Sequence, residues 1–227
     1  AKDFIREGLE ISIQYDVPVM LRMTTRICHS KGVVECHDRI ESEVSGFQKN
    51  PEKFVVLPAH ARVRHRWAIE RLEKLQAFAE ESSLNTIEEK STEIGIVTAG
   101  VTYQYVKEVM PEASIFKLGM TYPLPMEKIR NFSSSKKHLL VIEELESFIE
   151  EQVKAAGIKC EGKKFISNLG ELSPDAVAED FVMAGFLEEK PEAERVEHQL
   201  PRPPIFCPGC PHRAVYYTLN HLNALVT

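Results

Sequence analysis

The stretch EIGIVTAG, residues 93–100, decides the fold of this chain. It is a short apolar run that ends in glycine, which is the pattern of a buried strand followed by a turn. Residues 101–110, VTYQYVKEVM, then predict a helix, and Pro111 ends it because proline cannot continue a helix. A second apolar run, ASIFKLG, occupies 113–119. A strand, a helix and another strand in this order indicate parallel strands joined by a crossover helix.

The same alternation continues to residue 185. It predicts helices at 126–132, 145–157 and 173–185, and strands at 137–144 and 162–168. Gly157 and Gly185 stand where helices commonly end in a left-handed residue, and Ser173 and Pro174 suit the start of the last helix. We therefore predict an α/β fold, a three-layer sandwich with a mostly parallel sheet.

The regions on either side of this sandwich have other patterns. We divide the chain into residues 1–35, a connector at 36–90, the sandwich at 91–186, a charged and proline-rich linker at 187–204, and a new start at 205–227. The first region has a helical apolar spacing at Ile5, Leu9 and Ile13. Alternation from Val17 to Leu21 then predicts a strand before a polar loop. The connector predicts a helix with the apolar stripe Val63, Trp67, Leu72, Leu75 and Phe78.

The composition is that of an ordinary soluble protein. Its 227 residues are 43% hydrophobic and 27% charged, and a net charge of -6 argues against nucleic acid as the main partner. No apolar run approaches the ~20 residues of a membrane span, and from the first residues we expect no signal peptide. Five cysteines, an odd number, favour a reducing, cytoplasmic setting over a disulfide framework. Because both ends fall inside helical patterns, we expect a piece of a longer polypeptide.

Two cysteines near the end, Cys207 and Cys210 in CPGCPHR, have the spacing that lets two thiolates bind one ion. A helix is predicted after Pro211, and its dipole would favour the thiolate form. Zinc needs four ligands, whereas Cys207, Cys210 and His212 give three at most. A thioredoxin-type pair lacks a fold around it, and an iron–sulfur cluster needs ligands from further sequence. Simple packing at a helix entry fits the spacing equally well.

A second candidate site is RMTTRICHS, residues 22–30, directly after the predicted strand. Loops at the carboxyl ends of parallel strands commonly bind ligands. Arg26 could pair with a carboxylate, and Thr24 and Thr25 could donate hydrogen bonds to it. His29 could move a proton. The alternative is a polar loop whose hydroxyls satisfy backbone groups.

Four weaker patterns favour no specific site. The basic run HARVRHR, 60–66, could meet phosphate or an acidic surface, but it is more typical of a solvated helix face. The single glycine of VTAGVTY does not make a dinucleotide-binding G-x-G-x-x-G motif. EELESFIEEQ, 143–152, is an acidic helix start that complements the helix dipole. A nucleophilic arrangement of Cys28, His29 and Asp38 is conceivable, but nothing in the sequence fixes its geometry.

Six stretches, in order, make the chain resemble one protein family. They are PVMLRMTTRICHS (18–30), PAHARVRHRW (58–67), KLGMTYPLP (117–125), VIEELESFIEEQV (141–153), GELSPD (170–175) and RPPIFCPGCPHR (202–213). Together they resemble the large subunits of the indolepyruvate branch of the 2-oxoacid:ferredoxin oxidoreductase family. Its members are thiamine-diphosphate and iron–sulfur enzymes that oxidatively decarboxylate an aryl 2-oxoacid to its acyl-CoA and pass the electrons to ferredoxin.

The resemblance implies an assignment for each region. Residues 1–35 would end a pyrimidine-binding thiamine domain, and 205–227 would open a pyrophosphate-binding one. Residues 91–186 would be a transketolase C-terminal-like domain that binds no cofactor itself. Because the chain carries neither a GDG-type diphosphate motif nor a ferredoxin-like cysteine run, we expect this piece alone to hold no cofactor and to be inactive.

The resemblance also implies site residues and partners. Thr24, Thr25, Arg26 and His29 would face the thiamine cleft and orient the carboxylate or carbonyl of the substrate. The pair Cys207 and Cys210 matches a CxxC that helps to hold a cluster near the thiamine in relatives. The intact enzyme would contain thiamine diphosphate with Mg and 4Fe-4S clusters, and its partners would be a beta subunit, ferredoxin, a 2-oxoacid and coenzyme A.

Two alternatives stay open at this point. A related oxidoreductase for pyruvate or another 2-oxoacid would differ in its substrates, which assays on the complete complex would show. A non-enzymatic α/β module that serves subunit assembly or binds zinc through its CxxC pair is the other, and a zinc determination would identify the zinc-binding form.

Overall fold

A computed structural model describes residues 2–29, 32–35, 38, 46–191, 206 and 209–224 of the chain. The chain divides into two units, residues 1–191 and residues 192–227. The first unit holds helices α1 (Lys2–Tyr15), α2 (Thr25–His29), α3 (Pro51–Phe54), α4 (Pro58–Glu81), α5 (Thr102–Val109), α6 (Met126–Ser134), α7 (Phe148–Ala155) and α8 (Pro174–Met183). Its strands are β1 (Thr86–Glu88), β2 (Ile94–Ala99), β3 (Ser114–Leu118) and β4 (His138–Ile142). The second unit holds α9 (His212–His221).

The four strands form one sheet in the order β1-β3-β2-β4. β2 lies between β3 and β4 and is parallel to both, whereas β1 pairs with β3 in the antiparallel sense. Ile96 of β2 is opposite Ile115 of β3 and Leu140 of β4. The mostly parallel sheet predicted from the alternation is therefore confirmed.

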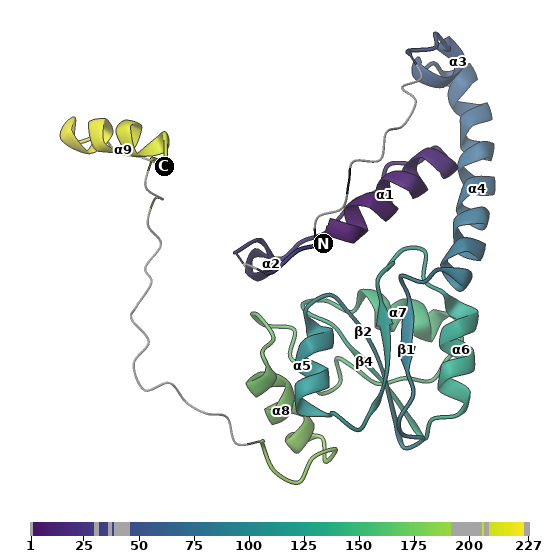
Figure 1. The fold of residues 1–227 in the computed structure, drawn as a ribbon, viewed down its shortest axis with the longest axis vertical. Helices are drawn as coiled ribbons and strands as arrows, with labels where there is room; N and C mark the ends of the chain where they lie inside the picture. Colours follow the sequence, from purple (N-terminus) through teal and green to yellow (C-terminus); the bar gives the residue numbers. More distant parts are fainter. Residues whose placement is uncertain are drawn as a thin grey trace. The chain divides into compact units, whose positions relative to one another are not determined.

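Helices cover both faces of the sheet, as Figure 1 shows. Side chains of a strand alternate between its two faces, so neighbouring residues enter different cores. Ile96 belongs to the core that α5 and α8 cover, which includes Val106 and Phe181. Val97, the next residue, belongs to the core that α6 and α7 cover, which includes Ile129. This arrangement is the predicted three-layer sandwich.

The helix boundaries of the sandwich follow the expected capping signals. Ser173 is the N-cap of α8, and its hydroxyl accepts a hydrogen bond from the amide of Ala176 at 3.1 Å. Gly157 and Gly185 have φ values of +75° and +77° just beyond α7 and α8. These left-handed residues end the helices because glycine lacks the Cβ that would clash there.

Residues 162–168 do not form the predicted fourth parallel strand. One parallel bridge joins Leu140 to Glu161, and the chain then leaves the sheet. Gly162 lies so close to β4 that a Cβ would be 2.6 Å from the carbonyl oxygen of Val141. Its own carbonyl accepts hydrogen bonds from the amides of Phe165 and Ile166, so the backbone coils into turns. A short apolar run can be buried in a turn as well as in a strand.

The N-terminal region differs from its prediction in two ways. Residues 17–21 are not a strand, because none of the described residues offers them a ladder of backbone hydrogen bonds. The expected polar loop instead begins with the short helix α2. Two short elements of the connector, α3 and the edge strand β1, were not predicted, since each has fewer than five residues and too little pattern.

The predicted apolar stripes of α1 and α4 are only partly buried. In α1, Ile11 is buried, whereas Ile5, Leu9 and Ile13 are 52%, 60% and 82% exposed. In α4, Leu75 near the C-terminal end is buried, but the side chains of Val63, Trp67 and Leu72 stay exposed. The N-terminal helices therefore keep an apolar surface that the described part of the chain does not cover.

Candidate functional sites

The segment that ends in α2 carries the residues predicted to contact substrate. The carbonyl of Thr24 accepts a hydrogen bond from the amide of Cys28 at 3.0 Å, which fixes Thr24 at the start of the helix. Within α2, Thr25 and His29 are four residues apart and so lie on one face. Both have exposed side chains. The side chain of Arg26 is outside the described residues.

The hydroxyl of Thr24 is the most informative atom of this segment. It is buried and has no hydrogen-bond partner among the described residues. Buried hydroxyls are normally paired, because an unpaired one costs about 1–3 kcal/mol. The nucleophilic alternative gains no support, since no hydrogen bond in the described part of the chain joins Cys28 to His29 or Asp38.

The cysteine pair is only half visible in the structure. Cys207 is outside the described residues, while Cys210 is a half-buried free thiol directly before Pro211 and α9. The carbonyl of Cys210 accepts a hydrogen bond from the amide of Arg213 at 3.2 Å. Described side chains nowhere form a group of three or more that could hold a metal ion. Cys210 and His212 fall short of four ligands, so we derive no cluster chemistry from them.

Asp16, the residue after α1, joins the N-terminal segment to the connector. Its carboxylate is 2.5 Å from Nζ of Lys53, 3.3 Å from Arg64 and 3.6 Å from Arg71. Arg71 also donates to the backbone carbonyl of Asp16. The hydrogen bond from Lys53 lowers the pKa of the Asp16 carboxyl below its ordinary value, since it favours the ionised form.

The C-terminal end of α4 holds the loop of the KLGMTYPLP motif. The buried Asn85 donates to the carbonyl of Ala79 at 3.0 Å and accepts from the amides of Gly119 and Met120, both at 3.0 Å. A Cβ on Gly119 would lie 2.3 Å from the carbonyl oxygen of Leu84, so only glycine fits there. The motif is therefore a packing contact between α4 and the sheet.

A second contact from α4 starts helix α6. The carboxylate of Glu80 accepts hydrogen bonds from the amides of Glu127 at 3.0 Å and Lys128 at 2.9 Å. These two amides belong to the first turn of α6, where backbone N–H groups have no partner within the helix. Gln76 adds a hydrogen bond from its side chain to the carbonyl of Leu124. Helix α4 is thus fixed firmly to the α/β domain.

The acidic motif EELESFIEEQ is structural, as predicted. The buried carboxylate of Glu143 accepts hydrogen bonds from the amides of Ile149 and Glu150 in the first turn of α7. Burial raises the pKa of Glu143, against the opposite effect of these amides. Glu144 accepts from the amide of Leu172, and the buried Glu150 accepts from the amide of Lys163. The carboxylates complete backbone hydrogen bonding and form no acid–base pair.

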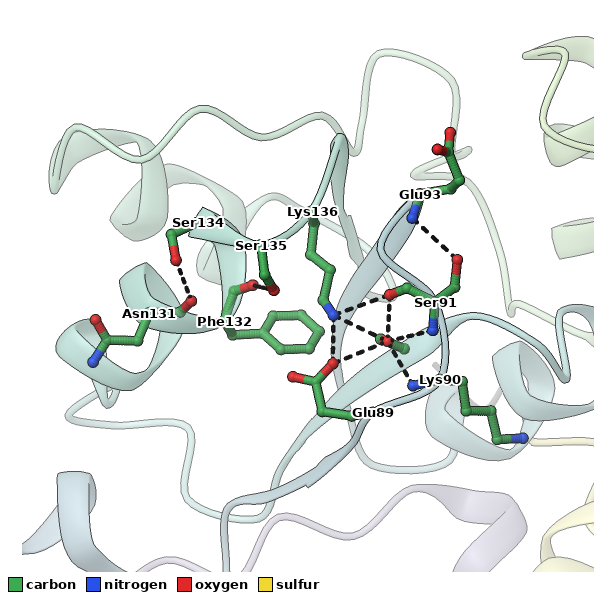
Figure 2. Close-up of polar contacts among 10 residues, drawn as sticks. Glu89, Lys90, Ser91, Glu93, Asn131, Phe132, Ser134, Ser135 and Lys136 are labelled. Atoms are coloured by element: carbon green, nitrogen blue, oxygen red, sulfur yellow. Dashed lines mark hydrogen bonds and ion pairs between the residues drawn. The ribbon is translucent and has the colours of Figure 1, made fainter.

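A buried lysine lies at the amino ends of β3 and β4. Figure 2 shows Lys136 pointing toward Glu89 and the backbone of Ser91. Its side chain is 2% exposed, and Nζ donates to the carbonyl of Ser91 at 3.0 Å and to the hydroxyl of Ser114 at 3.1 Å. Gly95 leaves room for it, because a Cβ there would be 2.7 Å from Cγ of Lys136. A serine and a lysine in contact can form a nucleophilic pair.

Ser114 is nevertheless a structural residue. It is fully buried and already accepts from the amides of Lys90 and Ser91 at 2.9 and 3.0 Å. It donates to the carbonyl of Ser91 at 2.7 Å. The cluster also lies at the amino ends of the strands, opposite the edge where parallel sheets bind ligands. The hydrogen bonds of the cluster therefore connect Ser91 to the amino ends of β3 and β4. Its geometry supports no catalytic role.

The basic run HARVRHR occupies the first turns of α4. Arg64 stacks on Trp67, with the guanidinium carbon 4.7 Å from the ring centre, and pairs with Asp16. The side chains of Arg62, His65 and Arg66 are exposed. The predicted solvated face is thus correct for part of the run, while Arg64 serves an intramolecular contact. No helix in the described part of the chain is both long and apolar enough to cross a membrane.

Comparison with known proteins reveals relatives along almost the whole chain. The indolepyruvate oxidoreductase subunit IorA of Methanothermobacter marburgensis is 36% identical over 235 residues. Those of Archaeoglobus fulgidus and Pyrococcus abyssi are 32% and 33% identical over 246 residues. The matches include 96%, 98% and 97% of this chain, which spans 38% of the length of each relative.

Two further comparisons add little. No family model matches the chain. A solved 2-oxoglutarate:ferredoxin oxidoreductase from Magnetococcus marinus, with 2-oxoglutarate, coenzyme A and succinyl-CoA bound, is 19% identical with a TM-score of 0.44. That likeness covers 54% of this chain and 23% of the other.

The curated relatives define a class first, since all three are oxidoreductase subunits and this chain matches one segment of each. More particularly, the chain is similar along almost its whole length to the IorA subunits of indolepyruvate oxidoreductases. The resemblance seen in the six motifs is therefore confirmed.

Sequence reasoning missed the residues that hold the segments together. Asp16 follows the predicted helix end and has a φ of +51°, a left-handed position that Asp and Asn tolerate, so its place was recoverable from the pattern. Asn85 and Lys136 carry no such signal. Their partners are 34 and 22 residues away, at Gly119 and Ser114, and a sequence pattern does not display contacts of that range.

Proposed function

We propose that the complete protein is the large subunit of an oxidoreductase that converts indolepyruvate and other aryl 2-oxoacids to acyl-CoA and passes the electrons to ferredoxin. The observation that carries this proposal is the identity to IorA subunits, 36% to 32% over nearly the whole chain. The same similarity supports a second subunit, ferredoxin, the 2-oxoacid and coenzyme A as partners.

Within this chain, we propose that residues 24–29 face the substrate. The unpaired buried hydroxyl of Thr24 supports this, since a ligand that accepts its hydrogen bond would remove the cost of burying it. Arg26 would pair with the carboxylate of the oxoacid, because a guanidinium matches a carboxylate with two parallel hydrogen bonds. Thr25 would donate to the carboxylate or carbonyl, and His29 would move a proton.

The rest of the chain has a supporting role. When bound by the complete subunit, thiamine diphosphate supplies the electron sink that decarboxylation requires, and 4Fe-4S clusters carry electrons onward. Residues 24–29 would orient the oxoacid. The α/β domain would hold helix α4 of the connector, which contacts Asp16 at the start of their segment. Because the chain spans 38% of the length of its relatives, we propose that it is inactive alone.

The test is a pair of arginine variants in the complete two-subunit enzyme. Replacing Arg26→Ala removes the proposed partner of the substrate carboxylate, so kcat/KM for indolepyruvate should fall roughly 10- to 100-fold, the usual size of a charge-assisted hydrogen bond. Arg22→Ala, an exposed arginine of the same segment, is the matched control and should change kcat/KM less than about twofold. Unchanged kinetics for Arg26→Ala would refute the role of this segment.

The same preparation tests the substrate class. Indolepyruvate, pyruvate and 2-oxoglutarate are compared by ferredoxin reduction in the presence of coenzyme A. We expect the highest kcat/KM for indolepyruvate. A preference for pyruvate or 2-oxoglutarate would keep the reaction type and reassign the substrate, whereas no ferredoxin reduction with any of the three would contradict the proposed function.

A further inference from the structure

The residue between α1 and the segment 17–29 has an unusual set of partners. Asp16 brings one carboxylate to three cations, Lys53 of α3 and Arg64 and Arg71 of α4. Arg64 and Arg71 are seven residues apart, which places them on the same face of α4. Arg71 binds both the carboxylate and the backbone carbonyl of Asp16, so it fixes the backbone as well as the side chain.

Further contacts beside Asp16 hold the same junction. The ring of Tyr15 packs on Phe78 of α4 with centroids 5.5 Å apart. The amide of Val17 donates to the carbonyl of Ser12 at 3.2 Å, so the chain turns back along α1. Val19 then lies against Gly8, where a Cβ would be 3.2 Å from Cγ1 of Val19. The path from α1 into the segment is therefore set on both sides of the turn.

The other end of α4 is fixed to the α/β domain. Gln76, Glu80 and Asn85 make hydrogen bonds to residues between Gly119 and Lys128, as described above. A continuous helix of 24 residues joins these contacts to the cations around Asp16. A helix of this length spans about 36 Å, at 1.5 Å per residue. It can therefore transmit the position of the rigid domain to the segment.

We infer that Asp16 is a positioning residue: its contacts with Arg64 and Arg71 attach the segment 17–29 to α4 and so set where Thr24 and its neighbours stand. The expected change in kinetics rests on the proposed function of that segment. The attachment of the segment to α4 does not depend on that function. A carboxylate is required because removing it leaves three cations of like charge facing one another.

The experiment uses the complete enzyme with Asp16→Asn, Arg71→Gln, the double variant, and Glu10→Gln as the control. Glu10 is an acidic residue of α1, and within the described part of the chain its carboxylate makes an exposed ion pair with Arg6 at 4.0 Å. Hydrogen exchange of residues 17–29 reports on the attachment, and KM and kcat for the oxoacid report on positioning. Loss of folded enzyme lowers the apparent kcat but leaves KM unchanged, so a shift in KM distinguishes misplacement from simple instability.

We expect exchange of residues 17–29 to become about 10-fold faster in Asp16→Asn and in Arg71→Gln, while the sheet stays protected. KM for the oxoacid should rise roughly 10-fold in both, because misplacing a binding group by a short distance weakens its contacts. KM for ferredoxin should stay the same. The effect of the double variant should be smaller than the sum of the two single effects, since the ion pair between Asp16 and Arg71 is lost in each single variant. Asp16→Glu should restore most of the activity, and Glu10→Gln should match the unmodified enzyme.

Three results would each refute one claim about Asp16 or the segment 17–29. Unchanged exchange in Asp16→Asn would refute the attachment. Suppose that Arg26→Ala lowers kcat/KM. Faster exchange in Asp16→Asn with an unchanged KM for the oxoacid would then refute the positioning role. Faster exchange with neither Asp16→Asn nor Arg26→Ala affecting the kinetics would leave the attachment standing and refute the proposed function of the segment.

Discussion

The α/β domain and the N-terminal region before β1 bury their apolar residues to very different degrees. The domain encloses one apolar core on each face of its sheet, and side chains such as Ile96, Phe116 and Phe181 are fully buried. Among the described residues before β1, the only buried apolar side chains are Ile11, Leu75 and Ala79.

From that difference we infer that the α/β domain is stable by itself, whereas the region before β1 depends on contacts with the rest of the protein. The scaffold has the burial that makes a domain stable on its own. The region before β1 is held partly by the ion pairs at Asp16, and it leaves the row Ile5, Leu9 and Ile13 exposed. An exposed apolar row of this kind commonly marks a surface that another part of a protein covers. The segment proposed to face the substrate thus lies in the region that buries fewer apolar side chains.

The largest expected effect compares two helical isoleucines. Ile129 in α6 is fully buried, and Ile13 in α1 is 82% exposed. Ile129→Ala should lower the free energy of unfolding by about 2–5 kcal/mol, because it removes buried apolar contact and leaves a cavity. Ile13→Ala should change it by less than about 0.5 kcal/mol. Urea unfolding of the chain, followed by circular dichroism, measures both.

Equal losses of stability in the two variants would contradict the comparison. It would mean that α1 is part of the same cooperative core as α6. A loss confined to Ile13→Ala would reverse the roles that we assign to the two regions.

A smaller effect compares two free cysteines. Cys160 lies in the core that α6 and α7 cover, and Cys28 lies in α2. Cys160 is buried, whereas Cys28 is exposed. Burial raises the pKa of the Cys160 thiol to about 11, so it is almost entirely protonated at neutral pH and its thiolate increases as the pH rises toward that value. At pH 8, iodoacetamide should modify Cys160 about 100-fold more slowly than Cys28. Mass spectrometry of timed digests gives both rates.

The pH profile supplies the control for this prediction. Modification of Cys160 should accelerate about 10-fold per pH unit as long as its thiolate is the minor form. Similar rates at the two cysteines at pH 8 would show that α7 and the following turns open readily, against the account of a stable domain.

The sequence predicted the regular part of the fold and failed where contacts are long in range. The parallel sheet and its helices were predictable because each parallel strand is an apolar run and because Ser173 begins α8 while Gly157 follows the end of α7. The strand predicted at 17–21 was wrong because alternation alone does not provide a partner strand. The strand at 162–168 was wrong because Gly162 and its neighbours coil into turns beside β4.

The residues of the candidate site could be proposed from the sequence, but the contacts that hold their segment in place could not. Thr24, Thr25, Arg26 and His29 were identified from residue type and from the resemblance, and their roles stay predictions. Asp16 and its partners Arg64 and Arg71 are 48 and 55 residues apart in sequence, so no local pattern joins them. The metal role of Cys207 and Cys210 also stays a prediction, with Cys207 outside the described residues.

Native-state hydrogen exchange tests the central claim most directly, on the 227-residue chain alone and on the complete two-subunit enzyme. Amides of β2, β3 and β4 should be protected to the same degree in both, because the α/β domain is a scaffold stable by itself. Amides of residues 17–29 should exchange rapidly in the chain alone and gain roughly 100-fold protection in the complete enzyme. Strong protection of 17–29 in the chain alone, or loss of sheet protection there, would contradict the account.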